Sequence, residues 1–144
     1  MEGIAEKFPG ALEEIKSALG EDTITLKKET ILPICRYLKE KGYNFLSDLT
    51  GLDLGIEKEP RYQVVYHLYS IETAKRLRLK VNLSSQDPAV ETVTVVWKTA
   101  NWFEREAYDL LGITFTNHPD LTRILLPDGF DGHQLRKDYP VRGR

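Results

Sequence analysis

The chain has 144 residues, of which 41% are hydrophobic and 29% are charged, and its formal net charge is -2 at pH 7. This composition is typical of one folded domain with its own hydrophobic core and excludes an intrinsically disordered chain. The slightly acidic balance disfavours nucleic-acid binding, because a protein that neutralises phosphates carries a basic excess.

The single cysteine, Cys35, excludes an intramolecular disulfide. It lies in an apolar stretch, so we expect a small buried side chain. The N-terminus lacks a basic region followed by an apolar stretch, and no apolar run reaches about 18 residues. We therefore expect a cytoplasmic protein without a secretory signal, which reaches a membrane only through partners.

The first half of the chain predicts two helices and two strands. Apolar residues recur at helical spacing over residues 4–19, and a glycine follows, which predicts a helix. Residues 23–27 alternate as in a strand. Residues 30–41 predict a second helix with a threonine at its N-cap. Residues 45–54 have strand character, with an interruption expected at Gly51.

The second half predicts three strands and a helix. Residues 62–70 are rich in aromatic and β-branched side chains, and residues 77–83 alternate between apolar and polar side chains. After a short loop, residues 90–97 form a further strand candidate. A helix is expected over residues 101–111, where a glycine ends it.

The last part of the chain has a different composition. Proline and glycine punctuate residues 118–144, and apolar side chains are sparse there. We therefore predict an α/β domain over residues 1–117 and an irregular C-terminal arm over residues 118–144. The order of elements predicts an α+β fold, with helices packed on a mostly antiparallel or mixed sheet.

No residues are apparent that would hold a cofactor. An iron–sulfur cluster usually takes four cysteine ligands, and a nucleotide needs a glycine-rich turn before a helix. The chain offers neither, and its few cysteines and histidines disfavour structural zinc. His118 precedes Pro119, and we expect its ring to bond to a backbone group rather than to bind a metal. We expect no cofactor and no metal in this chain.

The predicted helix over residues 101–111 carries the densest set of charges. Its apolar stripe is Phe103, Ala107, Leu110 and Leu111. Glu104 and Glu106 lie in the first turns, where acids complement the helix dipole. Paired carboxylates leave open a second class of function, a small acid–base enzyme that uses Glu104 or Glu106.

Asp109 lies in the last turn of this helix, where an anion opposes the dipole. Arg105 precedes it by four residues, which is the weaker order for an ion pair on a helix. We therefore expect a second cationic partner, either Arg123, Arg136 or Lys137, or a residue of a neighbouring chain. If the partner is another chain, Asp109→Ala or Arg136→Ala would change the domain's stability by no more than about 1 kcal/mol while impairing assembly.

The last third of the chain resembles the 30-kDa subunit family, the C subunits, of the proton-pumping NADH:quinone oxidoreductase, respiratory complex I. The matching residues are Trp102-Phe103-Glu104-Arg105-Glu106, Tyr108-Asp109, Gly112-Ile113, Phe115, His118-Pro119-Asp120-Leu121, Arg123-Ile124-Leu125, Phe130, Gly132-His133 and Leu135-Arg136-Lys137-Asp138-Tyr139-Pro140. Gln134 departs from the family, where a proline is expected.

The resemblance implies an α/β sandwich with an extended arm and no flavin, iron–sulfur cluster or quinone in this chain; partner subunits hold those groups. It implies a structural and assembly subunit on the cytoplasmic side of the cell membrane, peripheral, beside the D (quinone-site), B and I subunits. An equivalent subunit of a membrane-bound energy-converting nickel–iron hydrogenase or ferredoxin-linked complex is the alternative. The residues expected at subunit interfaces are Glu104, Arg105, Glu106, Asp109, His118, Pro119, Arg123, Arg136, Lys137 and Asp138.

Overall fold

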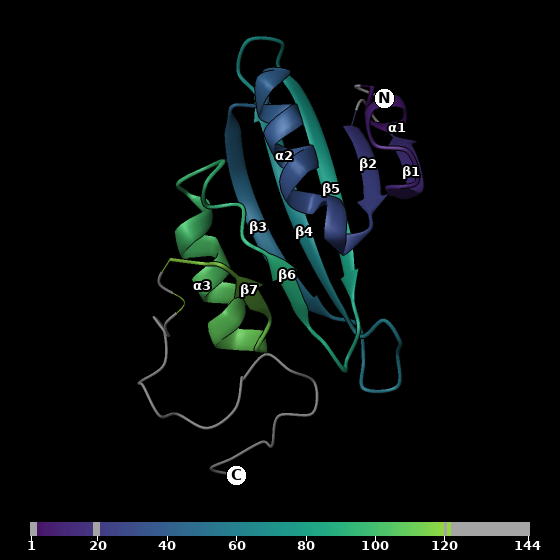
Figure 1. Cartoon of the computed structure of the whole chain (residues 1–144), viewed down its shortest axis with the longest axis vertical. Helices are drawn as coiled ribbons and strands as arrows, with labels where there is room; N and C mark the ends of the chain where they lie inside the picture. The colour runs from purple at the N-terminus through teal and green to yellow at the C-terminus, as the bar shows by residue number, and fades with distance from the viewer. Residues whose placement is uncertain (1–2, 19–20, 120, 122–144) are drawn as a thin grey trace.

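The computed structural model describes residues 3–18, 21–119 and 121, and shows a five-stranded sheet with helices on one face (Figure 1). The strand order is β1-β2-β5-β4-β3, with β2 and β5 parallel and the other neighbours antiparallel. The strands are β1 Leu12–Ala18, β2 Glu21–Leu26, β3 Phe45–Asp53, β4 Tyr62–Ser70 and β5 Lys75–Leu83. This arrangement confirms the predicted α+β fold with a mixed sheet.

The remaining elements lie outside this sheet. They are the short helix α1 Ile4–Lys7, the 3-10 helix Lys28–Thr30, α2 Ile31–Glu40, α3 Ala100–Leu111, and a parallel pair of short strands, β6 Ala89–Glu91 and β7 Thr114–Thr116. In Figure 1, α2 crosses the face of the main sheet, and α3 lies beside β3 with β6 and β7 close to it. The helices predicted over residues 30–41 and 101–111 are confirmed.

The prediction of a helix over residues 4–19 was wrong. Helix α1 ends at Lys7, and β1 begins at Leu12 and pairs with β2, where Ile15 lies opposite Ile24. Between them, Gly10 has a φ of +79°, a conformation that does not continue a right-handed helix. The apolar spacing fits a helix, but pairing with β2 decides the structure, because sheet formation overrides local propensity.

The strand predicted over residues 90–97 is only partly present. Strand β6 ends at Glu91, and the chain then turns, with the Val93 carbonyl accepting bonds from the N–H groups of Val96 and Trp97. Strand β7 was not predicted. It pairs with β6 and is three residues long, too short to show a sequence period.

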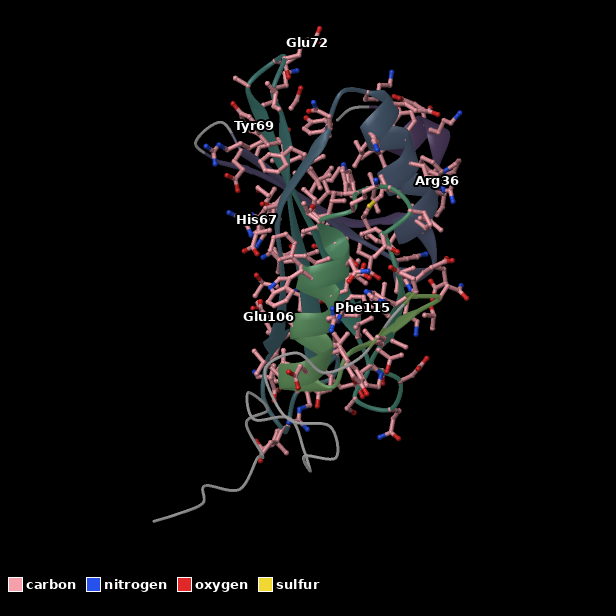
Figure 2. All side chains as sticks on the ribbon, turned by 90° about the vertical axis from the view of Figure 1, so that its left-hand side faces the viewer. Arg36, His67, Tyr69, Glu72, Glu106 and Phe115 are labelled. Atoms are coloured by element: carbon pink, nitrogen blue, oxygen red, sulfur yellow. The ribbon has the colours of Figure 1, made fainter. Side chains whose placement is uncertain are left out.

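The main sheet has one covered face and one open face. Alternate residues of β4 and β5, such as Tyr66 and Leu79, are buried under the helices. The intervening residues, such as His67 and Tyr69, are only partly buried on the other face. Figure 2 shows these two side chains on one side of the sheet, with Arg36 of α2 on the opposite side. The hydrophobic core therefore lies between the sheet and the helices.

Helix α2 presents one apolar stripe to this core. Its buried residues, at spacings of three and four, are Ile31, Ile34, Cys35 and Leu38. The expected burial of Cys35 is confirmed. Thr30 precedes the helix without a side-chain cap, since its hydroxyl donates to the Lys27 carbonyl at 2.7 Å.

Strand β3 runs without a break through Gly51, contrary to the expected interruption. Gly51 is paired with Val64 of β4. A Cβ atom at Gly51 would lie 2.8 Å from Leu111 Cδ1 and 2.9 Å from Ile113 Cδ1. Such distances are too short for carbon atoms, so the glycine makes room for α3 against β3.

The boundary predicted at residue 118 stays a prediction, because residues 122–144 lie outside the described part of the chain. Within the described part, no helix combines the length and the apolar character that crossing a membrane requires.

Candidate functional site

The buried face of α3 differs from the predicted apolar stripe. Ala107 and Leu111 are buried as expected, but Phe103 and Leu110 are only half-buried. A carboxylate, Glu104, takes a place on the core face and is fully buried. Full burial of a glutamate is rare unless its oxygens have hydrogen-bond partners, so the surroundings of Glu104 are the first candidate for a functional site.

Both oxygens of Glu104 accept hydrogen bonds from the turn after β6. The Thr92 hydroxyl donates to Oε1 at 2.5 Å, and the Val93 N–H donates to Oε2 at 2.9 Å. The two donors are consecutive in the chain, so the carboxylate fastens α3 to this turn. A carboxylate that is buried and bonded on both oxygens is not presented to a substrate, which removes the main support for an acid–base enzyme using Glu104.

The interior around Glu104 contains other ionisable groups. Burial raises the pKa of Glu104 to about 7, although the bonds from Thr92 and Val93 act in the opposite direction. Burial, and then the Glu104 charge, raise the pKa of the Cys35 thiol and of the Tyr66 hydroxyl. The Tyr66 hydroxyl has no hydrogen-bond partner among the described residues. Cys35 of α2, Tyr66 of β4 and Glu104 of α3 thus form one polar cluster within the core.

His118 joins this cluster from the segment after β7. Its side chain is fully buried, and its Nε2–H donates to the Asn101 carbonyl at 3.2 Å. The same nitrogen lies 3.8 Å from Glu104 Oε1. The expectation that His118 bonds to a backbone group is confirmed. Among the described residues no three histidine, cysteine or acidic side chains are grouped as metal ligands.

The residues predicted at subunit interfaces are not all on the surface. Glu104, Asp109 and the His118 side chain are fully buried within the domain. Arg105 and Glu106 are half-buried and Pro119 is exposed. The buried residues can act on an interface only indirectly, by fixing helix α3, which carries Arg105 and Glu106, and the segment after β7, which carries Pro119. The other predicted interface residues, Arg123, Arg136, Lys137 and Asp138, lie outside the described residues.

Sequence reasoning missed a buried ion pair between β3 and the start of β4. Arg61 Nη2 lies 2.8 Å from Asp53 Oδ2, and Arg61 Nε lies 3.0 Å from Asp53 Oδ1. Only 9% of the Arg61 side chain and 2% of the Asp53 side chain are exposed. The guanidinium also lies over the Tyr62 ring, 4.9 Å from its centroid. The sequence does place an acid, Asp53, at the end of one predicted strand and a base, Arg61, just before the next, and this placement could have predicted the pair.

These features define the class of the molecule: an α+β domain with a mixed sheet, whose described buried charges bond to other groups of the same chain. A family model described as "Respiratory-chain NADH dehydrogenase, 30 Kd subunit" matches residues 24–144. The chain belongs to this family, which confirms the resemblance seen in its last third.

Relatives extend the similarity over almost the whole chain. The chain is 48% identical, over 97% of its length and 87% of the relative's, to the C subunit of the NADH-quinone oxidoreductase of Geobacter sulfurreducens. It is 46% identical to the C 2 subunit of the NADH-quinone oxidoreductase of Rhizobium etli, over 97% of this chain and 75% of that one. The similarity therefore covers the domain as well as the C-terminal motif.

Solved structures show the same fold. A structure of "Nqo5 of the trypsin-resistant fragment (1-134)" is 37% identical, with a TM-score of 0.70, and the match covers 83% of this chain and 94% of that one. A chain of an archaeal "membrane-bound sulfane sulfur reductase" has a TM-score of 0.81 over 98% of this chain and 84% of that one. At 23% identity the second similarity shows the fold alone.

Proposed function

We propose that this chain is a structural and assembly subunit of the hydrophilic arm of an NADH:quinone oxidoreductase. There it supports electron transfer from NADH to quinone, coupled to proton translocation, without reacting itself. The observation that carries the proposal is the 48% identity, over 97% of the chain, to a relative named as a subunit of NADH-quinone oxidoreductase. The names of these relatives favour this assembly over the hydrogenase-type alternative.

The described interior supports a role without a redox group. An iron–sulfur cluster takes several thiolate ligands, whereas the chain has one cysteine, Cys35, which is buried. The buried carboxylate of Glu104 serves the contact between α3 and the turn at Thr92 and Val93. We therefore propose that flavin, iron–sulfur clusters and quinone are bound by partner subunits.

We further propose that the partners are the D, B and I subunits, and that the chain lies on the cytoplasmic side of the membrane as a peripheral subunit. Glu106 of α3 is half-buried and Pro119, which follows β7, is exposed, and the exposed parts of both support contacts with partners. Their fixed positions follow from the buried contacts of Glu104 and His118.

The test is recovery of the assembly from native membranes. A cell producing the tagged chain is solubilised in mild detergent, and the captured material is analysed by native gel, mass spectrometry and NADH:quinone activity. We expect oxidoreductase subunits in fixed proportion and a loss of activity when the chain is deleted. Capture without any oxidoreductase subunit, or undiminished activity after deletion, would refute the proposal.

The pure chain provides a second test, directed at the absence of a cofactor. We expect a colourless protein without stoichiometric metal by visible spectrum and elemental analysis. One iron atom or one flavin per chain would show that the chain holds a redox group of its own.

A further inference from the structure

Strand β3 is an edge of the main sheet, and its hydrogen-bond register shows which backbone groups face outward. The Leu54 N–H donates to the Arg61 carbonyl at 2.7 Å, which continues the antiparallel ladder with β4 beyond the strand. Bonded pairs alternate along such a ladder, so Leu52 also bonds to β4. Leu49 and Gly51 therefore direct their N–H and C=O groups towards the free edge.

The outward N–H and C=O groups of Leu49 and Gly51 have few hydrogen-bond partners in the described part of the chain. The Leu49 N–H bonds to the Asp48 carboxylate at 2.9 Å. Gly51 lies opposite Val64 at a position where the alternation places no bond to β4, so its N–H and C=O point away from that strand. Unpaired backbone groups along an edge are a template for another strand.

The two edges of the sheet differ in their protection. On β1 the exposed Glu13, Glu14 and Lys16 place charges along the strand, which is a common way to prevent pairing with another strand. Strand β3 has a register shift between Leu46 and Asp48, but from Leu49 to Leu52 it carries no charged residue and no proline, and Leu52 is exposed. An edge of this kind is suited to being covered in the native assembly.

A groove runs beside this edge, between β3 and α3. It has a volume of about 60 Å³ and is lined by Leu49, Thr50, Gly51, Glu106, Ala107, Leu110 and Leu111. The lining is mostly apolar, and among the described lining residues only Glu106 carries a charge. The groove thus suits a small apolar side chain with a cation nearby.

Resting on the proposed function, we propose that β3 receives an extended segment of a partner subunit as a sixth strand. The segment places an apolar side chain in the groove and a lysine or arginine opposite Glu106. Its backbone pairs with the C=O of Leu49 and with the N–H and C=O of Gly51, while the Leu49 N–H keeps its bond to Asp48. Charge favours such a partner over a second copy of this chain, because β3 carries no cation to meet Glu106.

Cross-linking within the assembled complex tests the pairing directly. A photoreactive amino acid is placed at Thr50 or Leu52 of β3 in the full chain, and at Lys16 of β1 as the control. We expect the two β3 positions to link to residues two apart on one partner segment, because paired strands share a period of two. Links that scatter over several segments, or that join two copies of this chain, would overturn the proposal.

Charge reversal tests the predicted cation. Glu106→Lys is expected to lower recovery of the complex about tenfold, whereas Glu72→Lys, an exposed residue in the turn after β4, leaves recovery unchanged. Denaturant melts of both pure variants check that the domain still folds. Equal recovery of the two folded variants would contradict the role of Glu106.

Amide exchange separates this inference from the proposed function. The Gly51 amide is expected to exchange at least about tenfold more slowly in the complex than in the pure chain. If the chain recovers no oxidoreductase subunit, the proposed function fails. If it recovers the complex but Gly51 exchanges equally fast in both states, only the sixth strand fails.

Discussion

Glu104 of α3 and Thr92, which follows β6, are joined by a hydrogen bond of 2.5 Å in the interior of the domain. The two residues are twelve positions apart, and the carboxylate has no exposed surface. A buried carboxylate loses hydration, so its protonation state and the stability of the fold are linked.

The pH dependence of stability follows from this burial. The pKa of Glu104 is raised from 4.5 to about 7, so the folded state holds the proton more tightly than the unfolded state. The free energy of unfolding should therefore decrease as the pH rises from about 4.5 to about 7 and level off above that range. The expected decrease in the free energy of unfolding is roughly 3 kcal/mol. Urea denaturation at a series of pH values would measure it.

Glu104→Gln supplies the variant for this test. Glutamine keeps an acceptor for the Val93 N–H but does not titrate, so the decrease between these pH values should disappear. Glu106→Gln, at a half-buried position on the same helix, should retain it. A Glu104→Gln protein with an unchanged pH profile would assign the titration to another group.

Gly51→Ala should destabilise the domain by about 1–3 kcal/mol, because the new methyl group would overlap the ends of Leu111 and Ile113. Thermal and denaturant melts measure the effect. The neighbouring exposed Thr50→Ala should change stability by no more than about 0.5 kcal/mol. Equal effects at both positions would mean that the helix moves away from β3 without cost.

The Asp53–Arg61 pair should be sensitive to removal of either partner. Arg61→Ala leaves the buried carboxylate of Asp53 without its cation, and a loss of about 3–5 kcal/mol is expected. The double variant Asp53→Asn with Arg61→Met should recover part of that loss in denaturant melts, since no buried charge is left uncompensated. If the double variant loses as much stability as the single variants Asp53→Asn and Arg61→Met lose together, the two residues are not coupled.

The burial of Asp109 changes the expected effect of its replacement. Its exposed fraction is 0%, so Asp109→Ala should destabilise the pure domain by about 2–4 kcal/mol, in contrast to the small effect expected for a surface residue. Arg105→Ala, at a half-buried position, should cost no more than about 1 kcal/mol. Denaturant melts of both variants measure these changes in the free energy of unfolding. If Asp109→Ala leaves the stability unchanged, the interface role expected from the sequence is favoured.

The thiol of Cys35 should be unreactive in the native protein. Burial, and then the charge of Glu104, raise its pKa, and the side chain has no exposed surface. Reaction with a thiol reagent at pH 8 should be on the order of 10³-fold or more slower than in denaturant, because it requires opening of the core. Rapid native labelling would show that α2 opens locally.

Several elements could be predicted because local pattern and tertiary environment agree. Strand β4 spans the predicted residues 62–70, since one face of the strand meets the helices and the other does not. Helix α3 ends at Leu111, and the residue that follows, Gly112, has a φ of 78° that suits glycine. The family was evident from a motif of specific residues, which needs no knowledge of the fold.

Other features depend on partners that are distant in sequence. Apolar spacing near Ile15 fits a helix and a strand alike, and only the pairing with Ile24 of β2 decides between them. Glu104 lies in a run of charged residues that is typical of a solvated helix face. Its burial depends on donors at Thr92 and Val93, which no helical period reveals.

The sequence by itself determined the composition class, most of the elements and the family of this protein, because propensity, periodicity and motif are properties of neighbouring residues. The tertiary structure decided which charges are internal and which strands of the described chain form the edges of the main sheet. Those properties arise when segments that are far apart in the chain exclude water from one another, as α3 and the turn at Thr92 do around Glu104.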